Sequence, residues 1–295
     1  SRGLGDVYKR QVVPMADAKV SVATHALNYG TACFEGIRGY WNERQGQLYV
    51  LKLPEHYQRF LKSCHLLKIA HGLAVEDLCR ITCEVLQRDG YRQDLYIRPL
   101  AYKGSPVIKV ALRGIRDEVA VFAVPMGNYA DVTGLRLMTS PWQRNNDNAI
   151  PARSKITGGY VNAALAVDDA QQMGFDDAVM LTRDGHVSEA TSANLFIVAD
   201  GTLVSPSVSD DILVGITRSA VRELARDLGI PFESRTIDRS ELYGADEVLL
   251  CGTGVQIAPV MEIDYRTIGS GRMGPVTEAL QSTYFAAVRG DDDRY

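Results

Sequence analysis

Three short segments combine glycine with a lysine or a hydroxyl group and could carry chemistry on a small ligand. The first is PARSKITGGY, residues 151–160, in which Lys155 stands among small side chains. Partial burial there would lower the pKa of its amine and make it a competent nucleophile for a carbonyl group. Taken alone, a lysine in such a segment is more often an ordinary surface residue.

The other two segments could hold an anion. Gly215, Ile216 and Thr217 open a predicted helix, whose free N–H groups and hydroxyl would suit a phosphate at the positive end of the helix dipole. Cys251–Gly254 follows a buried-looking strand, where glycine permits a ligand to approach the backbone closely. An ordinary helix start and a plain turn would explain these residues without a ligand.

Strands and a pair of helices are predicted in the first half of the chain. The predicted strands are Gln47–Leu53, Leu95–Tyr102 and Glu118–Val124. Two amphipathic helical patterns lie between the first two strands. Pro54 suits the start of the first helix, and Gly90 suits the end of the second. This half is predicted to pack strands against a helix pair.

The second half carries turn signals and two further helices. Asp184–Gly185 and Asp200–Gly201 each separate apolar runs, which predicts two hairpins with type I′ turns. Helices are predicted at Ile216–Leu228 and Pro275–Val288. Since strands and helices do not alternate regularly, the sequence predicts an α+β fold and not a doubly wound sheet.

Composition narrows the class of function. The chain has 295 residues, 46% of them hydrophobic, which suits one large or two ordinary globular domains. A net charge of −4 indicates no nucleic-acid partner, and no apolar run reaches the ~20 residues of a membrane span. Five scattered cysteines and five histidines form no metal or disulfide pattern, so we expect no metal and a cytoplasmic location. Dinucleotide, P-loop, zincin and hydrolase fingerprints do not occur.

Taken in order along the chain, seven stretches carry a resemblance to a known family. They are Tyr29–Arg38, Glu55–Arg59, Tyr96–Pro99, Lys155–Tyr160, Val187–Phe196, Gly215–Arg218 and Gly252–Thr253. From Val12 to Arg289 the sequence resembles the branched-chain aminotransferases, of the D-amino-acid-transaminase-like (fold type IV) group of pyridoxal-phosphate enzymes. The resemblance implies a two-domain α+β fold with the cofactor in the cleft between the domains.

The resemblance also implies how pyridoxal phosphate is held. Lys155 matches the Schiff-base lysine, which binds the cofactor and shuttles a proton. Glu189 matches the carboxylate that faces the pyridine nitrogen, and Tyr160 matches the tyrosine at the phenolic oxygen. Four residues match the phosphate site: Arg59, Ile216, Thr217 and Thr253.

A substrate pocket is implied in the same way. Tyr96 and the backbone of Thr253 and Gly254 match the groups that bind the α-carboxylate. Arg98 matches the arginine that accepts the glutamate side chain. Gly36 and Arg38 complete the pocket motif.

Aromatic residues match the walls of the pocket, although as isolated residues they would more often belong to the core. They are Tyr29, Phe34 and Tyr129. Met126 stands where many relatives have an aromatic residue, and its flexible side chain would widen the pocket.

Four segments are expected along the chain. Residues 1–11 are expected to be a non-native or disordered start, and residues 12–125 the N-terminal domain. An interdomain linker is expected at residues 126–134. The C-terminal domain, which carries the cofactor lysine, is expected at residues 135–295.

The predicted reaction is amino transfer between leucine, isoleucine or valine and 2-oxoglutarate. The partners are therefore amino acids and 2-oxo acids, and the resemblance implies a homodimer or a higher homo-oligomer. An (R)-amine or D-amino-acid transaminase of the same fold is the nearest alternative. An aminodeoxychorismate lyase, an inactive protein that binds the cofactor, and an α+β domain without cofactor are the others.

Overall fold

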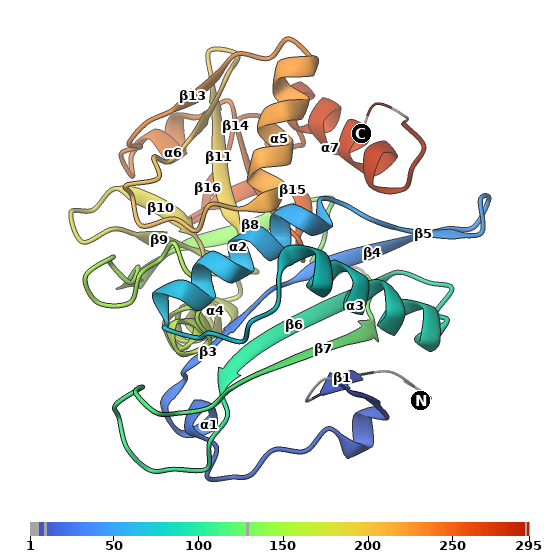
Figure 1. The fold of residues 1–295 in the computed structure, drawn as a ribbon. Coiled ribbons are helices and arrows are strands. Elements are labelled where there is room, and N and C mark those ends of the chain that lie inside the picture. The colour runs from blue at the N-terminus through green and yellow to red at the C-terminus, as the bar shows by residue number, and fades with distance from the viewer. Residues whose placement is uncertain (1–5, 9–10, 128–129, 293, 295) are drawn as a thin grey trace. The chain divides into compact units, whose positions relative to one another are not determined.

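A computed structural model describes residues 6–8, 11–127, 130–292 and 294. The chain forms two compact units. Unit 1 is Ser1–Gly127 with Ser154–Gly159, and unit 2 is Asn128–Arg153 with Tyr160–Tyr295. Both units combine helices with strands, which confirms the predicted α+β class (Figure 1). The segment Ser154–Gly159, with its lysine, groups with unit 1, whereas we expected it in the C-terminal domain.

Unit 1 is built on an antiparallel sheet with the strand order β2-β1-β7-β6-β4-β5, in which β3 also pairs with β6. Its strands are β1 (Asp6–Tyr8), β2 (Gln11–Val13), β3 (Ala32–Phe34), β4 (Ile37–Asn42), β5 (Gln47–Val50), β6 (Leu95–Lys103) and β7 (Asp117–Pro125). Its helices are η1 (Met15–Asp17), α1 (His25–Tyr29), α2 (Leu53–Leu66), α3 (Val75–Asp89) and η2 (Thr157–Gly159). As predicted, α2 and α3 pack on one another, and they lie against β3 and β7.

Two features of unit 1 differ from the sequence expectations. Strand β1 lies within residues 1–11, which were expected to be a non-native or disordered start, and it pairs with β7, with Val7 opposite Val121. The predicted strand Gln47–Leu53 ends at Val50, and α2 begins at Leu53. Pro54 explains the early helix start, because its fixed φ suits the first helical turn and it has no N–H to offer a strand.

Unit 2 is built on a mixed sheet with the strand order β10-β9-β8-β15-β14-β11-β12-β13, and β16 pairs with β15. Its strands are β8 (Leu135–Gln143), β9 (Asp177–Leu181), β10 (Val187–Ala190), β11 (Asn194–Ala199), β12 (Thr202–Ser205), β13 (Phe232–Ser234), β14 (Glu247–Gly252), β15 (Gln256–Ile263) and β16 (Arg266–Thr267). Its helices are α4 (Tyr160–Gln172), α5 (Ile216–Asp227), α6 (Glu241–Gly244) and α7 (Pro275–Val288). Helix α4 packs on β8 and β9, while α5 and α7 pack on each other and on β14.

Both predicted hairpins of unit 2 form, but only one has the predicted turn. Asp200 and Gly201 have φ of 49° and 74°, so both central residues are left-handed, as a type I′ turn requires. In the other hairpin Gly185 is left-handed at φ 88°, but Asp184 is not. The longer connection explains this, because the N–H of Thr182 donates to the carbonyl of His186 and closes a wider loop.

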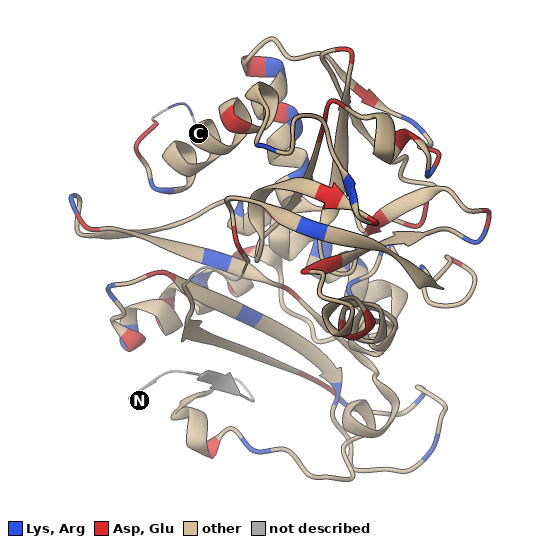
Figure 2. Ribbon diagram, turned by 180° about the vertical axis from the view of Figure 1, so that it is seen from behind, with Lys and Arg blue, Asp and Glu red and all other residues tan. Residues whose placement is uncertain are grey.

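Charged residues of both signs are interspersed in both units (Figure 2). In the part of the chain that the structure describes, no helix is long and apolar enough to cross a membrane.

Candidate functional site

One face of the unit 1 sheet collects four of the predicted substrate residues. Side chains alternate between the two faces of a strand, and residues paired across strands share a face. Arg38 on β4 pairs with Tyr96 on β6, and Phe34 on β3 pairs with Leu100 on β6. Because Arg98 lies midway between Tyr96 and Leu100, all four predicted residues share this face. They are Phe34, Arg38, Tyr96 and Arg98.

The Phe34 ring lies close to two cationic groups. The Nζ atom of Lys155 is 4.9 Å from the ring centre, and the guanidinium carbon of Arg98 is 4.3 Å from it. Arg98 Nη2 also donates to the Tyr96 hydroxyl at 3.0 Å. A Cβ at Gly36 would lie 2.3 Å from that hydroxyl, so only glycine leaves room for Tyr96 here.

Arg98 has one donor that the described residues do not satisfy. Its Nε is buried and has no hydrogen-bond partner among them. A buried donor without a partner is costly, and a guanidinium presents its donors in a fork that matches a carboxylate. This part of unit 1 can therefore receive a carboxylate beside an aromatic ring.

Backbone contacts fix the lysine segment within unit 1. The N–H of Lys155 donates to Ser63 Oγ at 3.1 Å, and its carbonyl accepts from the N–H of Phe34 at 3.0 Å. Three residues on, Gly158 donates to the carbonyl of Gly30 at 3.1 Å. Gly30 is left-handed at φ 65°, and a Cβ on it would lie 2.6 Å from the Gly158 Cα. These two glycines therefore permit the close approach that holds the lysine segment in place.

Arg59 lies on α2 and binds the carboxylate of Glu35, a residue to which the sequence analysis gave no role. Its Nε and Nη2 donate to the two carboxylate oxygens of Glu35 at 2.8 and 2.7 Å. His56, one turn earlier on α2, contacts the same carboxylate at 2.9 Å. Glu35 lies inside the Tyr29–Arg38 motif. Its position between Phe34 and Gly36 could have identified it as a site residue from the sequence.

Other predicted residues of this half lie at the end of α1, on β4 and directly after β7. Tyr29 ends α1, with its ring 4.7 Å from that of His25. Arg38 is buried and donates to the carbonyl of Gly127 at 2.7 Å. Met126 follows β7 directly. Tyr129, the third predicted aromatic wall, lies outside the described residues.

In unit 2 the buried carboxylate of Glu189 receives three donors. Arg144 Nη2 lies 2.5 Å from one oxygen, while the Asn194 side-chain amide and the N–H of Leu213 reach the other at 2.8 and 3.1 Å. Donors of this kind favour the ionised form of a carboxylate. Neither Arg144 nor Asn194 was given a role from the sequence, although Asn194 lies within the Val187–Phe196 motif.

The start of α5 lies beside this carboxylate. Its N-cap residue, Gly215, offers no side chain to cap the helix. A Cβ there would lie 2.0 Å from the Asn194 side-chain oxygen, so glycine is required. Ile216 and the buried Thr217 form the first turn, and uncapped N–H groups at a helix start favour an anion.

Thr253 and Gly254 lie at the same end of the unit 2 sheet. They belong to the turn between β14 and β15, and Asn194 pairs with Cys251 just before that turn. The sheet register therefore places this turn next to the Glu189 and α5 region. Tyr160 begins α4 in the same unit. Within each unit, the structure thus brings most of the predicted residues together.

The ion pair between Arg144 and Glu189 gives a stability prediction. Both side chains are largely buried, so Arg144→Met would leave a buried carboxylate without its cation, which typically costs about 3–5 kcal/mol. The free energy of unfolding in urea measures this loss. Arg136→Met is the matched control, because Arg136 forms a similar but exposed pair with Glu262, and we expect a much smaller loss there. Equal losses in the two variants would contradict a buried, ionised Glu189.

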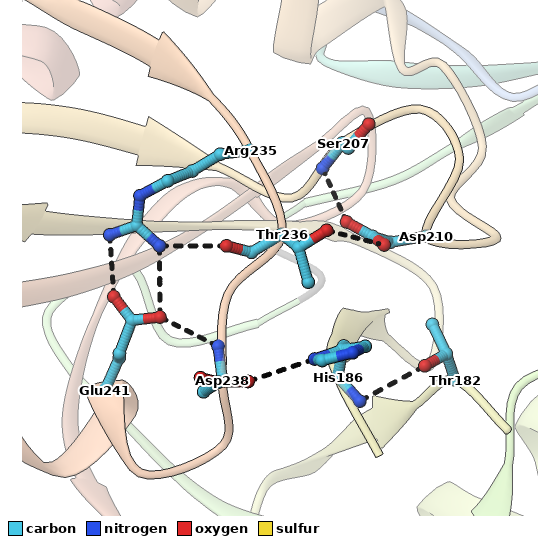
Figure 3. Close-up of polar contacts among 8 residues, drawn as sticks. All are labelled: Thr182, His186, Ser207, Asp210, Arg235, Thr236, Asp238 and Glu241. Atoms are coloured by element: carbon cyan, nitrogen blue, oxygen red, sulfur yellow. Dashed lines mark hydrogen bonds and ion pairs between the residues drawn. The ribbon is translucent and has the colours of Figure 1, made fainter. Parts of the chain in front are cut away.

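Unit 2 also contains a polar cavity of about 430 Å³ that includes none of the predicted site residues. Asn146, His186 and Asp210 are among its lining residues. Two of these lining residues have partners within the protein, as Figure 3 shows: His186 contacts Asp238, and Asp210 accepts from the N–H of Ser207. Among the described residues, no group of three or more His, Cys, Asp or Glu could hold a metal ion.

Comparison with known proteins identifies the class. Residues 32–263 match the family model described as amino-transferase class IV. The chain belongs to this family, and the resemblance drawn from its motifs is confirmed.

Individual relatives match nearly the whole chain. A probable branched-chain-amino-acid aminotransferase of Aquifex aeolicus (strain VF5) is 44% identical over 290 residues, which cover 98% of this chain and 93% of that protein. The crystal structure of the branched-chain aminotransferase from the archaeon Thermoproteus uzoniensis, with norvaline, has a TM-score of 0.95 at 39% identity and covers 99% of this chain and 97% of that one. The branched-chain amino acid aminotransferase from Thermobaculum terrenum, in its PLP-form (holo-form), has a TM-score of 0.94 at 34% identity, with coverage of 100% and 96%.

Proposed function

We propose that this chain is a pyridoxal-phosphate-dependent aminotransferase that exchanges amino groups between branched-chain L-amino acids and 2-oxoglutarate. The observation that carries the proposal is the Phe34 ring, with Lys155 Nζ and the Arg98 guanidinium both within 5 Å of its centre. Such an enzyme must accept an aliphatic side chain in one half-reaction and a carboxylate in the other. Phe34 supplies apolar surface for the first, and Arg98 supplies a cation for the second.

Each unit contains residues whose chemistry suits pyridoxal phosphate. Lys155 offers the amine that would hold the aldehyde carbon, and Glu189 offers the carboxylate for the pyridine nitrogen. Arg59 and the uncapped start of α5, with Thr217, suit a phosphate dianion. Thr253, Ile216 and Tyr160 complete the proposed set. When bound, pyridoxal phosphate supplies an electron sink and a carrier for the amino group.

Lys155 would then act as the proton carrier of the reaction. Its Nζ takes the proton from the α-carbon of the substrate and later returns one. Tyr96 and the backbone of Thr253 and Gly254 would hold the α-carboxylate, while Gly36 leaves space for the Tyr96 hydroxyl. Selectivity among leucine, isoleucine and valine is expected to be modest, because one methylene group is worth only ~1–3 kcal/mol in an apolar pocket.

The test compares single half-reactions followed by the absorbance of the bound cofactor. L-leucine should react faster than D-alanine and (R)-1-phenylethylamine by at least about tenfold, or ~1.4 kcal/mol in the barrier. A faster reaction with D-alanine or the (R)-amine would assign the chain to the alternative activity of the same fold. If none of the three compounds changes the absorbance of the bound cofactor, the chain is an inactive protein that binds the cofactor.

We further propose that the protein forms a homodimer or a higher homo-oligomer and acts in the cytoplasm. Apolar side chains at one end of unit 1 support self-association: Val22, Leu27, Ile108 and Val110 are 65–84% exposed. Their segments lie together, because the N–H of His25 donates to the carbonyl of Ser105. Light scattering, measured as the protein elutes from a size-exclusion column, gives the mass of the assembly. A monomer at micromolar concentration would contradict the proposal.

A further inference from the structure

Glu35 is a fully buried carboxylate with no role so far in the proposed reaction. It lies in the connection between β3 and β4, with Phe34 before it and Gly36 after it. Both of its oxygens are used. Arg59 Nε and Nη2 contact one oxygen each at 2.8 and 2.7 Å, and His56 Nδ1 contacts the second at 2.9 Å.

The charges of this trio are well defined. Burial opposes ionisation of Glu35, but Arg59 and then His56 outweigh it and lower the pKa of the carboxyl to about 2. Burial lowers the pKa of His56 and outweighs the hydrogen bond and negative charge of Glu35, which raise it, while the positive charges of Arg59 and Lys155 lower it further. At neutral pH the trio therefore holds one anion, one cation and a neutral imidazole that donates from Nδ1.

The position of Glu35 in the chain links two groups of site residues. Its neighbour Phe34 lies against the Lys155 amine, and its other neighbour Gly36 lies against the Tyr96 hydroxyl. Its side chain reaches in the other direction, to α2. Three consecutive residues thus contact the lysine segment, the helix α2 and the strand β6.

Two-point contact by a carboxylate fixes both the position and the plane of a guanidinium, since the two parallel hydrogen bonds fit only one relative orientation. The Arg59 side chain is about nine-tenths buried, so it has little access to solvent in which it could adopt another orientation.

We propose that Glu35 is a positioning residue that holds Arg59 and His56 in the orientation in which Arg59 receives the phosphate of the cofactor. This inference rests on the proposed function, because it takes Arg59 as a phosphate ligand. The rival explanation is that Glu35 only balances the charge of Arg59.

Glu35→Asp separates position from charge. Aspartate keeps the negative charge but withdraws it by one C–C bond, about 1.5 Å, so the two-point contact with Arg59 is lost. The apoprotein is titrated with pyridoxal phosphate and, separately, with pyridoxal, which lacks the phosphate. We expect the dissociation constant for pyridoxal phosphate to rise at least about tenfold and that for pyridoxal to change less than about twofold.

Glu35→Gln gives the opposite results under the two explanations. If Glu35 positions Arg59, the glutamine amide presents a donor to the guanidinium, and the preference for the phosphorylated compound falls. If Glu35 only balances charge, the variant gains positive charge beside the phosphate site and binds pyridoxal phosphate more tightly. Either variant decides the question if the other does not fold.

Two controls show whether the effect runs through Arg59. Glu118→Asp alters another buried carboxylate of unit 1, which accepts from Arg116 Nε at 2.8 Å and from the Tyr102 hydroxyl at 2.9 Å. It should leave both dissociation constants unchanged. In the Arg59→Gln background, Glu35→Asp should raise the dissociation constant for pyridoxal phosphate by less than about a further twofold.

The outcomes separate this inference from the proposed function. A wild-type chain that does not bind pyridoxal phosphate overturns both. A wild-type chain that prefers pyridoxal phosphate over pyridoxal, with the preference intact in Glu35→Asp, overturns only the role of Glu35. Equal losses for pyridoxal phosphate and pyridoxal would reduce that role to a structural one.

Discussion

Replacing Lys155 by alanine is expected to abolish transamination and the covalent link to the cofactor together. The lysine would be both the attachment point and the proton carrier. General acid–base catalysis alone is typically worth 10²–10⁴ in rate, so turnover with L-leucine should fall by at least about a thousandfold. The fold should survive, because the backbone N–H and carbonyl of Lys155, which alanine keeps, make the hydrogen bonds to Ser63 and Phe34 that hold this segment.

Borohydride reduction followed by peptide mapping measures the attachment directly. In the wild-type protein the adduct should lie on Lys155, and Lys155→Ala should give none. Lys103→Arg is a suitable control, because Lys103 is a buried lysine of unit 1 whose ammonium contacts Asp117 at 2.7 Å. That variant should keep the adduct on Lys155. An adduct on any other lysine would remove the basis of the proposed mechanism.

The sequence was most informative where local rules decide the structure. Helix α7 spans Pro275–Val288 as predicted, and α5 ends one residue before the predicted Leu228. Proline and glycine mark these ends through their own backbone preferences. Turn type was harder to predict, since Asp184 and Asp200 precede identical glycines but only Asp200 is left-handed. The difference comes from how the flanking strands pair.

The candidate site shows a similar division. The motifs named the groups that are proposed to contact the cofactor, such as Lys155 and Glu189, but not the residues that those groups contact within the protein. Arg144 is 45 residues from its partner in the sequence, and the pairing of β9 with both β8 and β10 brings their segments together. Arg59 and Glu35 are likewise separated by 24 residues. No spacing rule predicts such pairs, because they depend on tertiary packing.

Glu189→Gln is expected to lower turnover by at least about a hundredfold, or ~2.7 kcal/mol in the barrier, while the cofactor stays bound. An ionised carboxylate can hold a proton on the pyridine nitrogen, and that proton makes the ring an electron sink. Glutamine is neutral and cannot do so. Retention should change little, because Arg59, Thr217 and the start of α5 would still hold the phosphate.

Glu247→Gln is the matched control for this change. Glu247 is also a buried carboxylate of unit 2, and it accepts from the N–H groups of Val276 and Thr277 at the start of α7. Its loss should lower the free energy of unfolding and leave turnover per bound cofactor near the wild-type value. Turnover and cofactor content are measured on both variants. Together they distinguish an effect on the cofactor ring from an effect on the stability of the fold. If Glu189→Gln turned over as fast as Glu247→Gln, the carboxylate held by Arg144 would be a structural ion pair, and another group would have to protonate the ring.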